Sequence, residues 1–219
     1  MKNMVSKLVP SIILASIPPI LLIIWWPDFS EPVPIHWNYK GEADQWGTKN
    51  SLILISLIPF IIYGIMMAVP FIDPKKRILE MGNKFYNLSL GITLFLTIIS
   101  CFIMVISKSG QTLPNNLIIG LLGGLFAFLG NYMKTVKPNY FIGIKTPWTL
   151  ENETVWKKTH LLGGKLWFIG GISILVLSLI LTPTTLFIAF ISIILVITLI
   201  PFTYSFIIYK SLPKGTSKH

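Results

Sequence analysis

The chain has 219 residues, of which 53% are hydrophobic and 12% are charged, and its mean hydropathy is +0.72. About 25% of the residues of a soluble globular domain are charged, so this chain has too little polar surface to face water on all sides. The composition excludes an ordinary cytosolic enzyme and a disordered chain, and the single cysteine excludes a disulfide framework and a cysteine-based zinc site.

Six apolar stretches are long enough to cross a bilayer, because a spanning helix needs about 20 mostly apolar residues. These stretches lie near residues 8–26, 51–72, 85–107, 117–133, 164–182 and 184–208. Their residues do not alternate between apolar and polar, as the strands of a membrane barrel do. The bilayer interior also requires each stretch to satisfy its own backbone hydrogen bonds, as a helix does. The sequence therefore predicts an all-α, polytopic membrane protein with six transmembrane helices.

The positions of Lys and Arg predict the orientation, because cytoplasmic connections are richer in these residues than external ones. With the amino terminus in the cytoplasm, the external segments hold Lys40, Lys49 and Lys108, and the internal segments hold the other 15 of the 18. Both termini are therefore expected in the cytoplasm of a cell whose plasma membrane holds the protein. The net charge of +10 then reflects topology and attraction to anionic lipid, and we expect no direct binding of nucleic acid.

The apolar cores of these stretches contain no Asp, Glu, Lys, Arg or His. Proton relays, ion-coupled carriers and intramembrane proteases normally require such side chains within the membrane. We therefore expect neither an enzyme nor a cofactor. A passive pore and a lipid-binding protein remain compatible with the sequence.

Glycines cluster in the fourth stretch and at the start of the fifth. Gly120 and Gly124 form a G-x-x-x-G spacing, and further glycines stand at 163, 164, 170 and 171. Small residues allow helices to approach closely, so close helix packing is the expected role. The alternative for Gly163-Gly164 is a flexible joint at the entry to the fifth span.

The external connection, residues 27–50, is longer than a simple turn requires. Its prolines favour an extended backbone, residues 38–41 favour a turn, and its tryptophans and tyrosine suit the headgroup zone. We expect an ordered loop at the membrane surface. His36, Glu42 and Asp44 are the residues that can hold a cation here, but their spacing is not that of a recognised metal site.

The internal connection, about 134–163, is predicted to contain a short amphipathic helix in the membrane interface that bends into the fifth span. Thr149 is the expected N-cap of this helix. One helical face carries Trp156, His160, Gly164 and Trp167. Since no Ser, Cys or carboxylate lies one turn from His160, a structural role is favoured over catalysis. Trp148 and Trp156 are expected to anchor the connection at the interface.

The external connection resembles the DUF1648 domain, whose pattern is I-P-x-H-[FW]-N-x-x-G-x-x-D-x-x-x-x-K. The matching residues are Pro34, His36, Trp37, Asn38, Gly41, Asp44 and Lys49, with Val33 at the isoleucine position. The resemblance implies a DUF1648-like region over residues 1–72, which contains two spans and the loop. All of the matching residues from His36 to Lys49 are candidates for binding a ligand outside the cell.

The internal connection resembles the SdpI family signature, N-Y-x-x-G-[IL]-[RK]-T-P-W-T-L followed by V-W-x-x-T-H. The candidate signature residues are Asn139, Tyr140, Gly143, Lys145, Thr146, Pro147, Trp148, Thr149, Trp156, Thr159, His160 and Gly163. The resemblance implies an SdpI-like region over residues 73–219, with four spans and the signature in 134–163. Whether the signature binds a partner or shapes the fold is open at this point.

Membership of this family implies an immunity and signal-transduction protein. Its namesake is an immunity protein that protects a producer cell from a secreted, membrane-active peptide toxin and holds a transcriptional repressor at the membrane. The implied partners are therefore the bilayer, a peptide toxin outside and a repressor inside, and no catalytic residue is implied. The alternative is a passive transporter or channel for a small or lipid-like solute, with its path between the fourth and fifth helices.

Overall fold

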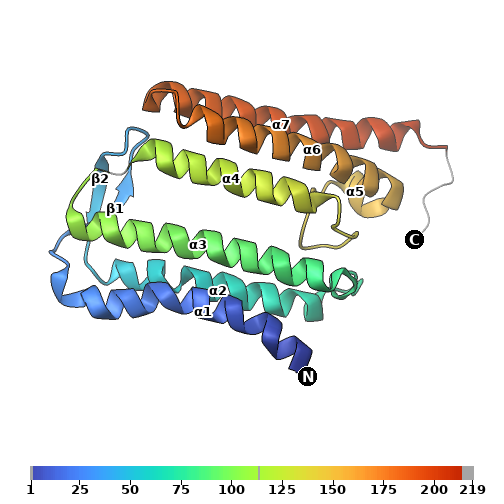
Figure 1. Ribbon diagram of the computed structural model, residues 1–219. Coiled ribbons are helices and arrows are strands. Elements are labelled where there is room, and N and C mark those ends of the chain that lie inside the picture. The colour runs from blue at the N-terminus through green and yellow to red at the C-terminus, as the bar shows by residue number, and fades with distance from the viewer. Residues whose placement is uncertain (1, 113, 214–219) are drawn as a thin grey trace. The chain divides into compact units, whose positions relative to one another are not determined.

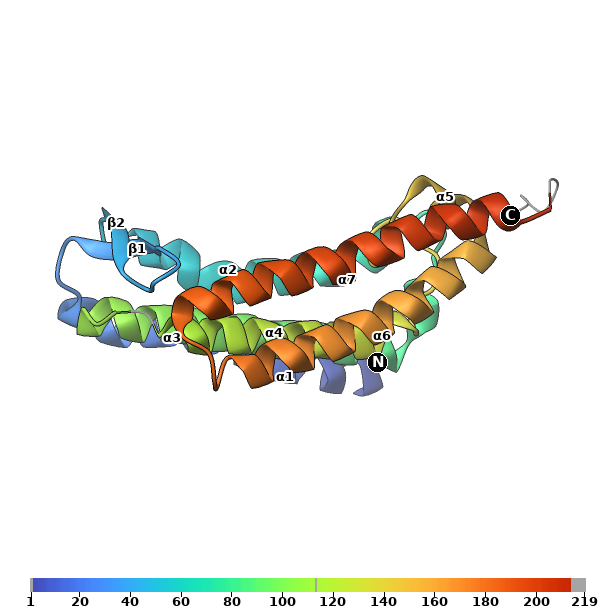
Figure 2. The same ribbon diagram turned by 90° about the horizontal axis from the view of Figure 1, so that it is seen from above.

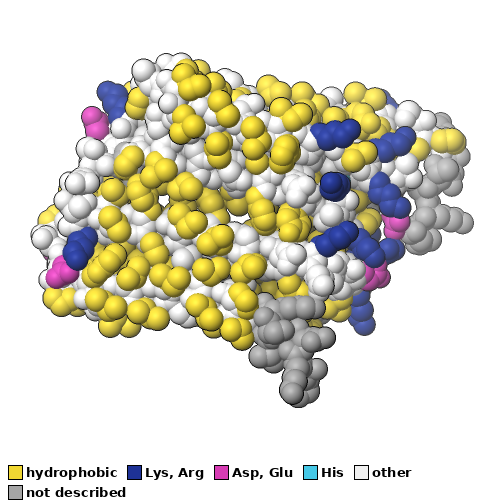
Figure 3. Space-filling model, in the orientation of Figure 1, with side chains coloured by type: hydrophobic (Ala, Val, Ile, Leu, Met, Phe, Trp, Pro, Cys, Tyr) yellow, Lys and Arg dark blue, Asp and Glu magenta, His cyan; other side chains and the backbone are white. Residues whose placement is uncertain are grey.

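The structure is a computed structural model that describes residues 2–112 and 114–213. Within these ranges, six helices are long and apolar enough to cross a membrane, which confirms the predicted spans. Their bounds are α1 Lys2–Trp25, α2 Ser51–Ile72, α3 Asn83–Ser109, α4 Asn115–Met133, α6 Glu153–Leu177 and α7 Pro183–Ser211 (Figure 1). Figure 3 shows apolar side chains over the flanks of the helices, with Lys and Arg near helix ends. The orientation stays a prediction, and Lys214 and Lys218, which contribute to it, lie outside the described residues.

The chain forms two compact units. The first contains α1, most of α2 and α3, and the connection between α1 and α2. The second contains the connection between α2 and α3, most of α4, and the chain from there through α6 and most of α7. The sequence-based division of the chain at residue 72 stays a prediction.

Hydroxyl groups join the three helices of the first unit. The Thr97 hydroxyl of α3 donates to the Leu14 carbonyl of α1 at 3.1 Å, and the Ser100 hydroxyl of α3 donates to the Ile55 carbonyl of α2 at 3.0 Å. Each bond satisfies a polar group that lipid cannot satisfy, so these contacts hold α3 against both partners. A buried cluster near one end of these helices comprises Leu22, Phe29, Val33, Leu52 and Met104.

A β-hairpin follows α1 and the 3-10 helix η1 (Trp26–Asp28). Strands β1 (Val33–Trp37) and β2 (Ala43–Gly47) pair antiparallel. The sequence predicts an ordered loop here, and the strand pairing was not expected from it. The reason is the irregular register beside Pro34, which interrupts the alternation by which short strands are identified. Val33 belongs to the buried cluster, so the hairpin is packed onto the helix ends.

Glycine contacts between α4 and α6 organise the second unit. A Cβ atom built on Gly123 would lie 2.8 Å from the Gly171 carbonyl oxygen, and one on Gly130 would lie 2.4 Å from the Phe168 nitrogen. The two backbones are therefore in direct contact, and helix packing is the confirmed role of these glycines. Because α6 is unbroken from Glu153 to Leu177, the alternative of a flexible joint at Gly163-Gly164 is wrong.

The short helix before the fifth span is α5, Pro147–Glu151. The Thr146 hydroxyl accepts the Thr149 N–H at 3.2 Å, and the Thr149 hydroxyl accepts the Thr146 N–H at 2.8 Å. Thr146 is therefore the N-cap and the predicted Thr149 cap is wrong; Pro147 at the first helical position is the sequence signal for the earlier start. A second cap, Asn152, then begins α6, so the predicted amphipathic segment is split between two helices.

Helix α5 packs against the carboxy-terminal half of α7 (Figure 2). The Trp148 ring lies 5.7 Å from the Phe202 ring and 4.9 Å from the Phe206 ring, measured between centroids. The Thr146 and Ser205 hydroxyls lie 3.1 Å apart in the interior. These contacts fix the start of α5 within the internal connection.

Candidate functional site

The turn of the hairpin is built by Asn38. Its side-chain oxygen accepts the Lys40 N–H at 2.8 Å and the Glu42 N–H at 3.2 Å, and its side-chain nitrogen donates to the Glu42 carboxylate at 3.0 Å. Gly41 follows with φ +84°, a conformation that favours glycine. Two of the candidate binding residues, Asn38 and Gly41, thus serve to shape the hairpin.

The remaining candidates divide between an exposed and a packed set. His36 Nδ1 lies 2.5 Å from Asp44 Oδ1, and both side chains are exposed. Lys49 Nζ lies 5.0 Å from the Trp26 ring centroid, and the Trp37 indole N–H is buried with no hydrogen-bond partner in the described structure. Among the described residues no group of three His, Cys, Asp or Glu side chains is arranged to hold a metal ion.

Replacing Asn38 by alanine is expected to loosen the hairpin, because three hydrogen bonds of its side chain are lost. One such bond is worth about 1 kcal/mol net, so trypsin should cleave after Lys40 about fivefold faster or more. The control is Gln45→Ala, an exposed position on β2. Equal cleavage rates for the two variants would contradict this role.

Asn139 organises the start of the internal connection. This side chain is buried; its oxygen accepts the Phe141 and Ile142 N–H groups at 2.7 Å each, and its nitrogen donates to the Lys137 carbonyl at 2.7 Å and the Ile142 carbonyl at 3.1 Å. We call residues 137–146 the signature loop. All four hydrogen-bonding capacities of this amide serve the loop backbone, so Asn139 has a structural role here.

His160 holds the other end of the signature loop against α6. Its Nε2 accepts the Ile144 N–H at 2.9 Å, and its Nδ1 lies 2.8 Å from the Trp156 carbonyl oxygen, to which it donates. Because one ring nitrogen accepts and the other donates, the imidazole is neutral in this arrangement. Gly143 has φ +119°, and a Cβ there would lie 2.3 Å from His160 Nε2. Both ring nitrogens are used by the fold, which agrees with a structural role.

Trp156 lies beneath the same loop and is 1% exposed. Its indole N–H donates to the Val136 carbonyl at 2.8 Å, and its ring stacks on His160 at 4.0 Å. Trp156 is thus a core residue, and its predicted place in the membrane interface is wrong. The helical face of α6 predicted from Trp156 and His160 is confirmed, since both are buried while Lys157 and Lys158 are exposed.

The other signature residues are also either buried or exposed. Thr149 and Thr159 are fully buried, and a Cβ on Gly163 would lie 2.3 Å from the Ile144 side chain. On the surface, Tyr140 is 47% exposed, and Lys145 and Pro147 are also exposed. The Lys145 ammonium donates to the Tyr140 and Phe141 carbonyls at 3.3 Å each. The signature therefore consists of a buried scaffold that presents a few exposed side chains.

Ion pairs that do not follow from any local sequence pattern join the connection between α2 and α3 to this scaffold. Glu80, in the 3-10 helix η2 (Leu79–Met81), accepts a hydrogen bond from Lys137 at 2.7 Å, which lowers the pKa of its carboxyl. Arg77 pairs with Glu153 at 3.0 Å. These residues are far apart in the sequence, so only the tertiary structure brings them together.

Comparison with known proteins gives two family matches and a relative. The SdpI/YfhL protein family matches residues 135–205, and the domain of unknown function DUF1648 matches residues 13–63. The Immunity protein SdpI of Bacillus subtilis (strain 168) is 29% identical over 176 residues, which cover 79% of this chain and 82% of the relative. The chain thus resembles the SdpI family over its signature region and the Immunity protein SdpI over most of its length. No solved structure matches it significantly.

The SdpI-family and DUF1648 matches contain both sets of candidate residues. The DUF1648 match spans the hairpin and the ends of α1 and α2 that flank it, and the SdpI match spans the signature loop, α5, α6 and most of α7. The SdpI relationship and the six apolar helices identify a multi-pass protein of the plasma membrane. Neither comparison assigns a role to any single residue.

Labelling of introduced cysteines should place Tyr39 and Tyr140 on opposite sides of the membrane. Both are exposed, and the native Cys101 in α3 is replaced by serine in both variants. In intact cells, a membrane-impermeant maleimide should react with Tyr39→Cys, and with Tyr140→Cys only after permeabilisation, as the charge bias predicts. Reaction of both from one side would contradict the six-span topology.

Proposed function

We propose that this protein is a membrane immunity protein, which protects its own cell from a membrane-active peptide toxin. The observation that carries the proposal is the relationship to the Immunity protein SdpI over most of both chains. The matches to SdpI and DUF1648 support it because they lie in separate parts of the chain. The proposal concerns binding and protection, and it requires no chemical step.

The hairpin is the surface that we propose to contact the toxin. It exposes Tyr39 and Trp46 (44% and 53% exposed) beside the His36–Asp44 pair. Aromatic side chains give large apolar contacts at low entropic cost, and the pair adds polar contacts. Since the hairpin is packed onto the helix ends, a peptide bound there would meet a pre-formed surface.

The exposed part of the signature is the surface that we propose for a cytoplasmic partner, such as a transcriptional repressor. Tyr140 and Lys75 lie together on it, with the Lys75 ammonium 5.1 Å from the Tyr140 ring centroid. Binding of toxin would change this surface only if the toxin prefers one of two conformations. A passive transporter is less well supported, since the backbone contact of α4 and α6 fills the path that it requires between them.

The test is expression in a host that is sensitive to the peptide toxin. Cells that express the chain should survive toxin at concentrations that kill the empty-vector strain. Trp46→Ala should reduce this protection, whereas Gln45→Ala, its exposed neighbour on β2, should retain it. Full membrane expression without any protection would overturn the proposal.

A further inference from the structure

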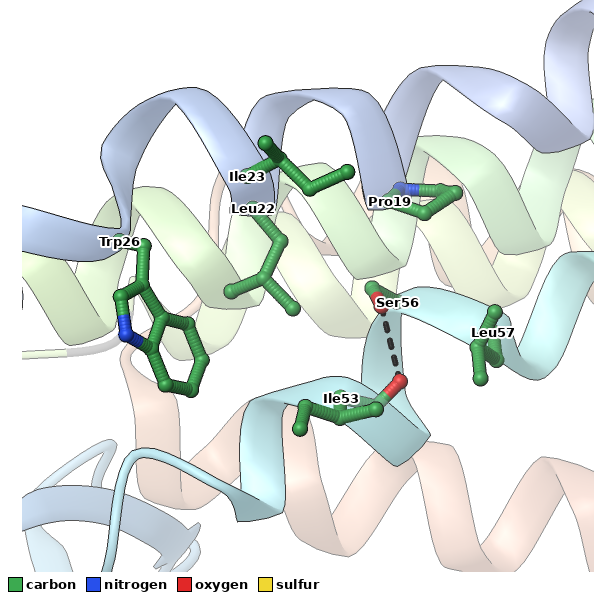
Figure 4. A pocket seen from close by; sticks show the side chains of 7 residues that line it. All are labelled: Pro19, Leu22, Ile23, Trp26, Ile53, Ser56 and Leu57. Carbon is green, nitrogen blue, oxygen red and sulfur yellow. Dashed lines mark hydrogen bonds between the residues drawn. The ribbon is translucent and has the colours of Figure 1, made fainter.

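A groove lies between α1 and α2 in the first unit (Figure 4). Its volume is about 490 Å³, which is within the range of sites that bind small molecules. The lining side chains are Pro19, Leu22, Ile23, Trp26, Ile53, Ser56 and Leu57. None of these seven lining residues belongs to the external or the internal connection, and the immunity role proposed above does not involve them.

The lining side chains favour an apolar ligand. Ser56 is its one hydroxyl, and that hydroxyl donates to the Ile53 carbonyl at 2.8 Å, as the dashed line in Figure 4 marks. The other lining side chains are apolar apart from the indole N–H of Trp26. The part of a ligand that fills the groove therefore gains from burial of apolar surface and not from hydrogen bonds.

The groove runs along α1 from Trp26, near the end of the candidate membrane span Leu8–Asp28, toward the middle of that span. Trp26 lies just after α1, at the level where tryptophan is favoured in membrane proteins. Pro19 is seven residues earlier, which corresponds to about 10 Å along a helix. Ile23 at its edge is 75% exposed, and the neighbouring Ile24 and Leu54 are each 63% exposed. The groove is thus open on a side that presents apolar side chains.

A cation lies at the interfacial end of the groove. The Lys49 ammonium is 5.0 Å from the Trp26 ring centroid. The nearby carboxylates are engaged elsewhere: Glu31 accepts the backbone N–H of Lys49 at 3.1 Å, and Asp28 pairs with Lys108 at 2.6 Å. In the described part of the chain, the ion pairs do not include Lys49, so no carboxylate lies within ion-pairing distance of its ammonium. This ammonium can therefore bind an anionic group next to the apolar groove.

We propose that this groove is a binding site for a membrane phospholipid, with one acyl chain in the groove and the phosphate on Lys49. The groove follows α1 for about 10 Å, from Pro19 to Trp26, and is open along one side. A slender acyl chain fits this shape. A phosphate just above the apolar chain is also the arrangement that a glycerophospholipid provides.

The test is native mass spectrometry of the full chain after extraction in mild detergent, with two matched pairs of variants. Ile53→Trp and Ile23→Trp place a large ring in the groove, whereas Leu54→Trp and Ile24→Trp alter neighbouring exposed positions that do not line it. The wild type and both controls should retain one phospholipid per chain. Each groove variant should lose at least 80% of it while helix content by circular dichroism is unchanged.

The headgroup contact is tested separately. Lys49→Gln should lower the retention of phosphatidylglycerol severalfold and leave uptake of diacylglycerol, which has no phosphate, unchanged. Equal phospholipid retention in all four tryptophan variants would overturn the proposal. A second result would also overturn it: a wild type that carries no lipid but binds a hydrophobic peptide, with that binding blocked by Ile53→Trp. Either result is independent of the protection assay, so the two proposals fail separately.

Discussion

Replacing Trp156 by alanine is expected to unfold the signature loop and to destabilise the second unit more than any other single truncation there. Removal of a fully buried tryptophan typically costs about 3–5 kcal/mol. The change also leaves the Val136 carbonyl without its 2.8 Å donor and removes the ring on which His160 stacks. Because His160 holds Ile144, loss of Trp156 should release the loop from α6. Chymotrypsin should then cleave after the exposed Tyr140 faster than in the wild type, because local unfolding makes the loop backbone accessible to the protease.

The matched control is Trp148→Ala, which removes the same side chain from a half-buried position. Trp148 contacts the rings of Phe202 and Phe206 but makes no hydrogen bond to the signature loop in the described structure. Its effect on thermal unfolding should be less than half that of Trp156→Ala, and cleavage after Tyr140 should stay slow. Equal cleavage in the two variants would show that Trp156 does not support the loop.

The spans and one face of α6 follow from the sequence alone, because both depend on local patterns. A run of about 20 apolar residues has one stable arrangement in lipid, so its location requires no tertiary information. The stripe of Trp156 and His160 follows from the 3.6-residue period in the same way. The period does not reveal what the stripe contacts. The sequence therefore predicts Trp156 in the interface, whereas the structure has it in the core.

The start of α5 shows why local signals can mislead. Thr146 and Thr149 are three residues apart, and either hydroxyl can cap a helix that begins after it. In the structure they form one capping box, with each hydroxyl accepting the other residue's N–H. The decision between them rests on Pro147, which is favoured at the first helical position, and on the buried contact of Thr146 with Ser205, which is 59 residues away.

The roles of the two motifs could not be derived before their contacts were known. Asn38 and Asn139 both match family patterns, and each uses its side-chain amide to fix a turn. A motif residue that is fully engaged by the backbone of its own loop determines shape. The surfaces left for partners are consequently the exposed side chains that these turns present, such as Tyr39 and Tyr140.

Gly123→Ala is expected to separate α4 from α6. Its new Cβ would lie 2.8 Å from both the Gly171 carbonyl oxygen and the Leu175 nitrogen. Both atoms belong to the backbone of α6, so a rotamer change cannot relieve the overlap and the helices must move apart. Overpacking of this kind costs about 1–3 kcal/mol, and the apparent unfolding temperature in detergent should fall by several degrees.

Gly124→Ala is the control, on the same helix and one residue away. Its Cβ would meet only the Leu175 side chain, at 3.7 Å, which is an ordinary contact. Alanine favours the helix over glycine by up to about 1 kcal/mol, so this variant should match or exceed the wild type in stability. Since both changes add one methyl group to one helix, a difference between them isolates the backbone contact. Equal stability would mean that α4 and α6 do not depend on direct contact at Gly123.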